Sequence, residues 1–165
     1  MNNWVFHIIN YLLKLHQKGV YSNYKRTYEI DDTFRFNGKD VILTGKGRII
    51  LGRNSYIGIG SSISSNADFI VEIGENCAIS HNVRIYNNSY ETDCNFNLMP
   101  RKHKFGNVKI GNGVWIGSNV VILPNVTVGD NSVIGANSVV IKDIPANNIC
   151  SGIPCKVIRE KKNVD

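Results

Sequence analysis

Residues 110–140, IGNGVWIGSNVVILPNVTVGDNSVIGANSVV, decide the fold, because the same pattern returns there every six residues. Each unit begins with an aliphatic residue, has asparagine or glycine in fourth place, and has a small or β-branched residue in fifth place. Asparagine and glycine adopt left-handed backbone angles at the lowest cost, so the fourth position is expected to turn the chain. Such a short, regular period indicates a repeat architecture.

The pattern reaches back to Leu51 and gives ten units, interrupted twice. Their first residues are Leu51, Ile57, Ile63, Ile73, Ile79, Ile110, Ile116, Ile122, Val128 and Ile134. Their fourth residues are Asn54, Gly60, Asn66, Asn76, Asn82, Gly113, Asn119, Asn125, Asn131 and Asn137. Their fifth residues are Ser55, Ser61, Ala67, Cys77, Val83, Val114, Val120, Val126, Ser132 and Ser138. We expect the first and fifth side chains to point inward.

A short strand followed by a bend, repeated three times, returns the backbone to its start one layer higher. Eighteen residues per coil then give a three-sided prism whose faces are parallel sheets, with strands ~4.8 Å apart. A β-sandwich with frequent turns is the alternative, but it gives no reason for asparagine or glycine at one phase of a six-residue period.

The period slips to four residues between Phe69 and Ile73, and it vanishes between Ile85 and Ile110. The second break is an insertion, YNNSYETDCNFNLMPRKHKFGNVK, which must leave the coil as a loop. Such loops commonly carry function. We therefore predict an N-terminal helix and connecting segment over residues 1–40, a β-helix over 41–145 with a loop at about 86–108, and a tail over 146–165.

The N-terminal residues 4–15, WVFHIINYLLKL, are apolar on nearly every face and suit a short helix that ends near Gly19. We expect this helix to pack on the rest of the protein. The alternative is a helix on a membrane surface, which Lys14, Lys18, Lys25 and Arg26 favour.

The chain has 165 residues, a formal net charge of +6, and 42% hydrophobic against 19% charged residues, which indicates a folded domain rather than a disordered segment. The four cysteines lack the spacing of a disulfide scaffold or a metal site, which predicts a reducing cytoplasm. The basic residues form no continuous stripe, so nucleic acid is not an expected partner.

The hexads, together with residues 73–86, 114–145 and 151–160, resemble the hexapeptide-repeat acyltransferases, above all the bacterial galactoside, maltose and capsular-polysaccharide O-acetyltransferases. The resemblance covers about residues 45–160. It implies an all-β, left-handed parallel β-helix that forms a homotrimer, with acetyl-CoA bound between neighbouring prisms. It also implies acetyl transfer to a saccharide hydroxyl in surface-polysaccharide synthesis, in the cytoplasm or at the periphery of the inner membrane.

Acetyl transfer to a hydroxyl needs a base, and histidine suits this role because its ordinary pKa is ~6.5. His7 and His16 lie in the N-terminal segment. His81 occupies the third, outward position of its unit, and ISHNV around it resembles the I-A-H-[DN]-[CV] segment at the catalytic histidine of lipid A acyltransferases and related sugar N-acetyltransferases. His81 is therefore the first candidate base.

The sequence departs from the sugar O-acetyltransferase pattern at Tyr90. In that subfamily the catalytic histidine falls nine residues after the position of His81, and here tyrosine stands there. With an ordinary pKa near 10, Tyr90 is a weak base at neutral pH. In order of preference, His81 has taken the role, His103 reaches in from the insertion, or the protein is a poor catalyst.

By the same resemblance, Lys142 and Arg159 lie near the nucleotide phosphates of acetyl-CoA, with Lys156 in the same C-terminal motif. Ala136 lines the pantetheine arm and Trp115 forms the cleft wall near the thioester. Acceptor contacts are expected from the start of the insertion, since aromatic rings stack on sugars and polar groups bond hydroxyls. These candidates are Tyr86, Asn87, Asn88, Tyr90, Glu91 and Asp93.

Two other functions compete with this prediction. A trimeric scaffold that kept the coil and lost catalysis is favoured by Tyr90, and failure to bind CoA would reveal it. A zinc enzyme of the γ-carbonic anhydrase kind shares the coil but needs three converging histidines. Only His81 lies within the hexads, with His103 in the insertion, so no metal is expected.

Overall fold

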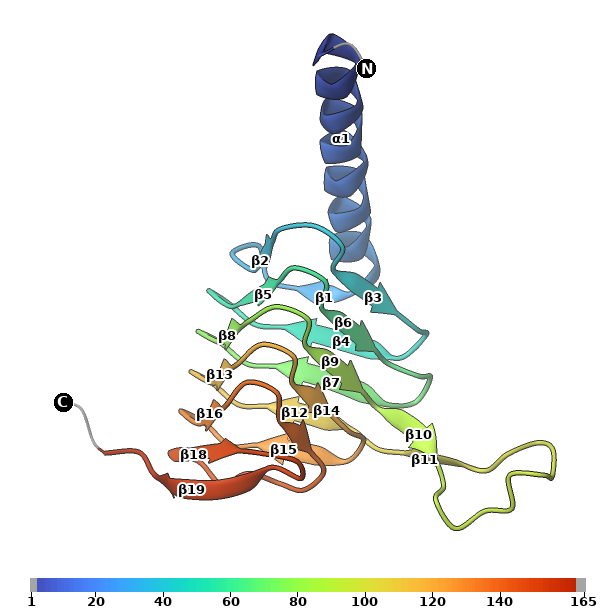
Figure 1. Cartoon of the computed structure of the whole chain (residues 1–165), viewed down its shortest axis with the longest axis vertical. Coiled ribbons are helices and arrows are strands. Elements are labelled where there is room, and N and C mark those ends of the chain that lie inside the picture. The colour runs from blue at the N-terminus through green and yellow to red at the C-terminus, as the bar shows by residue number, and fades with distance from the viewer. Residues whose placement is uncertain (1–2, 163–165) are drawn as a thin grey trace.

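The computed structural model describes residues 3–162 and shows one helix standing on the end of a three-sided prism of strands (Figure 1). Helix α1 spans Asn3–Thr27. The strands stack as parallel coils from the helix end towards the C-terminal end, as a left-handed β-helix. The predicted fold class is therefore confirmed.

Each side of the prism is one sheet. The first face contains β1 (Glu29–Ile30), β4 (Arg48–Leu51), β7 (Ile70–Ile73), β12 (Val108–Ile110) and β15 (Val126–Val128). The second face contains β2 (Arg35–Asn37), β5 (Tyr56–Gly58), β8 (Ala78–Ile79), β13 (Trp115–Ile116), β16 (Val133–Ile134), β18 (Asn148–Ser151) and β19 (Lys156–Glu160). The third face contains β3 (Ile42–Thr44), β6 (Ser62–Ser64), β9 (Arg84–Tyr86), β14 (Val121–Ile122) and β17 (Val139–Val140). All pairings within these faces are parallel except that of β18 with β19.

The first residue of every hexad is at most 1% exposed, so these ten aliphatic side chains form the core. Nine of the ten fourth-position residues have φ between 56° and 69°. Asn66 is the exception, because the chain slips there: Asp68 takes the left-handed angle and Ser65 takes the buried place expected of Ala67. The hexad pattern therefore forms the coil through burial and corner geometry together.

The eighteen-residue coil holds between strands β12–β14 and β15–β17, and the last coil is shorter, since Ile134 pairs with Cys150, sixteen residues later. Ile110 pairs with Val128, eighteen residues later, but Leu51 pairs with Ile73, twenty-two residues later. The early coils are longer because extra residues occupy the corner between the third and first faces, where the period slips.

The coil begins before residue 41 and ends after residue 145, the boundaries predicted from the sequence. β1 and β2 pair with β4 and β5, so the segment expected only to connect the helix forms the first coil. Past residue 145, β18 pairs with β16 and continues the second face.

Helix α1 differs from its prediction in length and in contacts. It runs through Gly19 to Thr27, and none of its described residues is buried. The expected packing of residues 4–15 on the coil is therefore wrong. The helix contacts the prism through its C-terminal part, where the Tyr21 ring stacks on Phe36 at 4.4 Å and the Tyr21 hydroxyl donates to the Gly38 carbonyl at 2.8 Å.

Candidate functional site

The insertion is a hairpin at the corner between the third and first faces. Strand β10 (Asn88–Tyr90) follows β9 and pairs antiparallel with β11 (His103–Phe105). This register sets Tyr90 opposite His103, with ring centroids 4.7 Å apart. The hairpin therefore brings an imidazole beside Tyr90, the position where the sugar O-acetyltransferase pattern expects a histidine.

An aromatic row extends from this pair in both directions; it consists of Phe69, Phe105, His103, Tyr90 and Phe96. Phe105 stacks on Phe69 at 5.4 Å and on His103 at 5.6 Å, and Phe96 meets the edge of Tyr90 at 5.9 Å. The Arg101 guanidinium lies over Tyr90 at 5.7 Å. The row anchors the hairpin on the coil through Phe69.

An open hollow of about 520 Å³ adjoins the coil end of the aromatic row. It is lined by Gly45, Lys46, Asn66, Ala67, Asp68, Phe69 and Phe105. It offers an aromatic surface, a carboxylate, an ammonium group and an amide side by side. These groups suit a ligand with hydroxyls and apolar ring faces.

His81 lies at a different corner, between β8 on the second face and β9 on the third. Its side chain is exposed, and its Nδ1 atom accepts a hydrogen bond from the Ile59 backbone N–H at 3.1 Å. In the neutral ring the proton then resides on Nε2, which acts as a donor. This arrangement leaves neither nitrogen of neutral His81 with a free lone pair for a substrate proton.

Asn87 is fully buried and has a structural role. Its Oδ1 atom accepts from the Asn66 backbone N–H at 2.9 Å, and its amide donates to Ser65 Oγ at 2.9 Å. It is therefore removed from the candidate acceptor contacts. Tyr86 and Asn88 are half-buried where the hairpin leaves the coil, and Asp93 is exposed nearer the hairpin tip.

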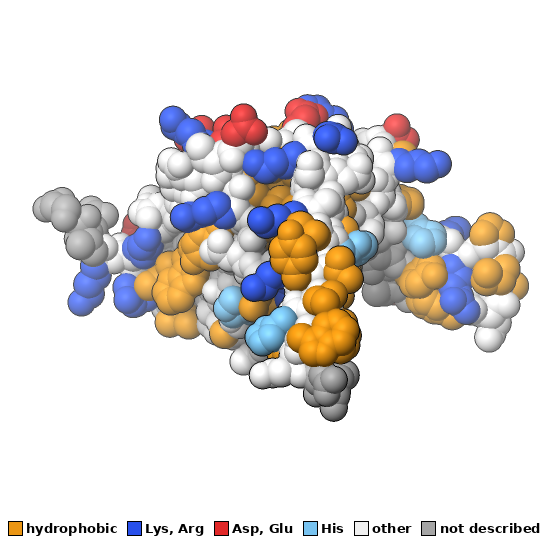
Figure 2. All heavy atoms as spheres, turned by 90° about the horizontal axis from the view of Figure 1, so that it is seen from above, with side chains coloured by type: hydrophobic (Ala, Val, Ile, Leu, Met, Phe, Trp, Pro, Cys, Tyr) orange, Lys and Arg blue, Asp and Glu red, His pale blue; other side chains and the backbone are white. Residues whose placement is uncertain are grey.

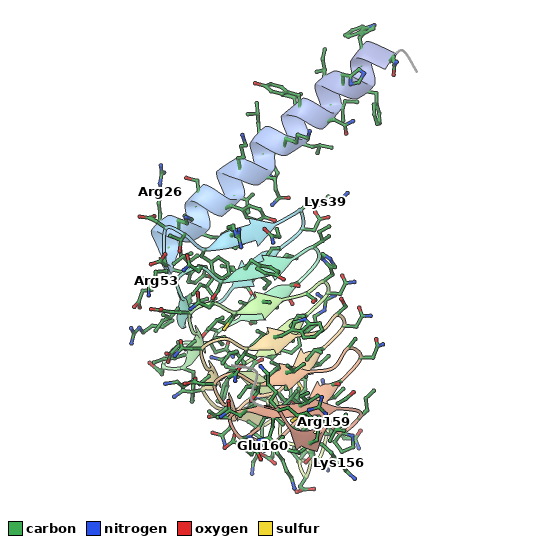
Figure 3. All side chains as sticks on the ribbon, turned by 90° about the vertical axis from the view of Figure 1, so that its left-hand side faces the viewer. Arg26, Lys39, Arg53, Lys156, Arg159 and Glu160 are labelled. Atoms are coloured by element: carbon green, nitrogen blue, oxygen red, sulfur yellow. The ribbon has the colours of Figure 1, made fainter. Side chains whose placement is uncertain are left out.

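The candidate coenzyme residues gather mainly on the second face. Trp115 is 54% exposed on β13, between Ala78 and Val133 of the neighbouring strands. Lys156 and Arg159 lie on β19, at the end of the prism opposite α1 (Figure 3).

Ala136 lies just beyond this surface, whereas Lys142 lies at the corner between the third and first faces, from which the hairpin also leaves. Ala136 is exposed in the corner after β16 and touches Gly117, where an added Cβ would meet the Ala136 backbone N at 2.5 Å. This close approach explains the glycine, since any side chain would separate the two coils. Lys142 is exposed after β17.

One chain does not bring the two groups of candidates together. The second face lies on one side of the prism, and the hairpin with His103 and Tyr90 projects from the other (Figure 1). His81 lies at the edge of the second face and away from the hairpin corner.

Sequence reasoning missed Phe69, Phe96, Phe105 and Arg101, all of which belong to the aromatic row or lie over it. Three of them lie in the insertion, and aromatic residues in an otherwise polar loop were the available signal. Among residues 3–162, no three histidine, cysteine, aspartate or glutamate side chains lie together as metal ligands.

The bacterial transferase hexapeptide family, with its six repeats, matches residues 107–142. Over these residues, which form part of the coil, the chain is similar to the hexapeptide-repeat transferases. It is 44% identical to the galactoside O-acetyltransferase of Escherichia coli (strain K12) over 117 residues, which cover 71% of this chain and 56% of that protein. The chain thus spans little more than half the length of this curated relative.

Two solved structures support the same assignment. A galactoside acetyltransferase in complex with coenzyme A is 37% identical, with a TM-score of 0.55 over 78% of this chain and 66% of that one. The polySia specific acetyltransferase NeuO is 30% identical, with a TM-score of 0.60 over 78% of this chain and 62% of that one.

Proposed function

We propose that this protein is an acetyl-CoA-dependent O-acetyltransferase that acetylates a hydroxyl of a saccharide. The observation that carries the proposal is the imidazole of His103 beside Tyr90, within an aromatic row whose coil end borders an open hollow, on a coil that resembles this transferase family. The relatives named as galactoside and polySia acetyltransferases support a sugar acceptor.

The contacts favour His103 over His81 as the base. Among residues 3–162, neither ring nitrogen of His103 hydrogen-bonds to another protein group, whereas Nδ1 of His81 is occupied by Ile59. In the proposed reaction His103 takes the hydroxyl proton as the oxygen attacks the thioester carbonyl. The C–O bond forms, the C–S bond breaks, and the proton passes to the departing thiolate of CoA.

The coenzyme is proposed to lie on the second face, with Trp115 beside the thioester, Ala136 along the pantetheine arm, and basic residues at the phosphates. These basic residues are Lys156 and Arg159, with Lys142 supplied from the hairpin corner of a neighbouring copy. Because this face and the hairpin lie on opposite sides of one prism, a complete site needs the second face of a neighbouring copy.

A homotrimer is the proposed assembly, and the chemistry of the faces supports it. The first face carries outward ion pairs, such as Lys109 with Glu72 at 3.8 Å and Arg48 with Glu29 at 2.8 Å. The second face presents Trp115 between Ala78 and Val133, an apolar surface suited to a protein neighbour.

The proposed biological role is acetylation during the synthesis of a surface polysaccharide, and the proposed compartment is the cytoplasm. The four cysteines are free thiols, which suits a reducing compartment. The competing function, a trimeric scaffold without catalysis, is favoured by tyrosine rather than histidine at position 90.

The test is thiol release from acetyl-CoA against a panel of sugars, oligosaccharides and nucleotide sugars. His103→Ala is expected to lower kcat by ~10²-fold or more, the usual contribution of a general base. His81→Ala should retain most of the turnover, and Lys104→Ala is a matched control on the same strand. Equal rates for wild type and His103→Ala, with a loss in His81→Ala, would return the role to His81.

A further inference from the structure

The N-terminal half of α1 is an unpartnered apolar surface. Eight large hydrophobic side chains between residues 4 and 15 are 43–62% exposed: Trp4, Phe6, Ile8, Ile9, Tyr11, Leu12, Leu13 and Leu15. Figure 2, which looks toward the helix end of the prism, shows hydrophobic side chains gathered there with lysine and arginine side chains close by. Such a large exposed apolar patch marks an interaction surface.

This half of the helix is not held by the prism. Among the described residues, the first helix residue with a side-chain hydrogen bond to the coil is Gln17, whose Oε1 atom accepts from the Asp40 backbone N–H at 3.3 Å. Further contacts follow at Tyr21 and at Lys25, whose Nζ donates to the Asp32 carbonyl at 2.9 Å. Residues 3–16 therefore project as a free helical arm (Figures 1 and 3).

The helix is cationic as well as apolar. It contains four basic residues, Lys14, Lys18, Lys25 and Arg26, and no acidic residue. His7, Asn10, Lys14 and Lys18 recur at intervals of three or four and form one narrow polar stripe. Over residues 4–15 the rest of the circumference is apolar, and His16 is the first polar residue on the opposite side. The charge is also graded along the axis, since three of the four basic residues lie after Leu15.

A helical bundle between copies fits this pattern less well. The heptad series Val5 and Leu12 continues at Gly19, and the paired series Ile8 and Leu15 continues at Ser22, so the apolar seam ends after about two heptads. A coiled coil needs three or four heptads. The apolar surface is also wider than the narrow seam that a coiled coil buries.

The dimensions fit partial entry into a bilayer. Residues 3–15 extend about 20 Å at ~1.5 Å per residue, whereas the hydrocarbon core is ~30 Å thick. Within residues 3–162, no helix is long and apolar enough to cross a membrane. The arm can therefore bury its apolar half in one leaflet while the later basic residues stay at the level of the headgroups.

We propose that α1 docks the protein on an anionic phospholipid membrane. Residues 4–15 enter the interfacial region, and Lys14, Lys18, Lys25 and Arg26 meet the lipid phosphates. The exposed apolar side chains, the basic residues and the length of α1 in a single chain support this proposal. Stronger binding through three helices rests on the proposed function, because in a side-by-side trimer all three arms leave the same end of the assembly.

The test is co-sedimentation of the full chain with vesicles of phosphatidylcholine alone or with about 30% phosphatidylglycerol, without acetyl-CoA. Wild type is expected to pellet with the anionic vesicles, and added salt should weaken binding. Trp4→Ser/Leu12→Ser should lower the bound fraction at least tenfold while keeping acetyl transfer and thermal stability. Lys14→Gln/Lys18→Gln should weaken anionic binding severalfold, and Lys102→Gln/Lys104→Gln, which removes equal charge elsewhere, should not.

Three outcomes would contradict docking of α1 on the membrane. They are no pelleting of wild type with anionic vesicles, equal pelleting of wild type and Trp4→Ser/Leu12→Ser, or dissociation of the assembly by that substitution. The last result would assign the arm to contacts between copies. Lipid binding is measured without turnover, so its failure is distinguishable from failure of the enzymatic proposal.

Discussion

At the scale of single residues, the corners of the prism depend on asparagine and glycine. Asn54, Asn119 and Asn131 combine φ near 57° with side-chain hydrogen bonds to asparagines one coil away, at 2.8–3.3 Å. The same residue type thus turns the chain and connects successive coils. This dual role explains why asparagine is more frequent than glycine at the fourth position.

Asn125 allows the backbone contribution to be measured separately. Its φ is 64°, and among residues 3–162 its side chain makes no hydrogen bond. We expect Asn125→Val to lower the free energy of unfolding by roughly 1–2 kcal/mol, because a β-branched residue clashes at this angle. Asn125→Gly should stay close to wild type in the same denaturant titration. Equal stability of the two variants would contradict the corner role.

Asn87 tests whether a residue at the start of the insertion is structural. Asn87→Ala leaves the Asn66 N–H without its buried acceptor and removes one hydrogen bond to Ser65 Oγ, which still donates to the Phe69 carbonyl, so we expect a loss of about 1–3 kcal/mol in unfolding free energy. KM for the acceptor should be unchanged in the folded variant. The half-buried neighbour Asn88→Ala is the matched control. A raised KM without loss of stability would restore Asn87 to the acceptor site.

Core and corner residues could be predicted from the sequence because their spacing is periodic. The turn expected at Asn66 lies at Asp68 instead, because the period slips to four residues there. The sequence pattern shows that the period slips but not which residue takes the left-handed angle. Asn87 and the tautomer of His81 depend on partners 21 and 22 residues away in the chain. Contacts between coils decide these roles, and a single hexad does not encode them.

At the scale of elements, the hairpin is separable from the coil. The Gly106 backbone N–H donates to the Asn87 carbonyl at 3.1 Å, so the two ends of the excursion already meet. The pairing within it was not predictable, because β10 and β11 share only three residue pairs and show no alternating pattern. The length of α1 was missed for a related reason, since glycine inside a helix costs only ~1 kcal/mol and does not force an end.

Replacing residues 88–105 by a Gly-Gly bridge should leave the coil folded and remove turnover. We expect the melting temperature to change by only a few degrees, because the core hexads are untouched. Acetyl-CoA binding should persist and saccharide-dependent thiol release should disappear. Circular dichroism, calorimetry and the thiol assay check these outcomes, and retained turnover would exclude a catalytic role for the hairpin.

At the scale of the whole molecule, each proposed site contains the hairpin of one copy and the second face of another. Co-expression of His103→Ala with Lys156→Glu/Arg159→Glu tests this directly. Randomly mixed trimers should recover about a quarter of wild-type activity, because half of the hairpins and half of the second faces are intact. The absence of recovery in verified mixed assemblies would show that one chain supplies both parts.

Every proposed step depends on the binding of acetyl-CoA to this coil, which titration calorimetry with the purified protein measures. We predict saturable binding of one acetyl-CoA per chain, weakened roughly tenfold by Arg159→Ala through the loss of a charged hydrogen bond to phosphate. Saturation without any effect of Arg159→Ala would move the phosphate site elsewhere. No binding of acetyl-CoA at all would contradict the enzymatic account and leave a scaffold.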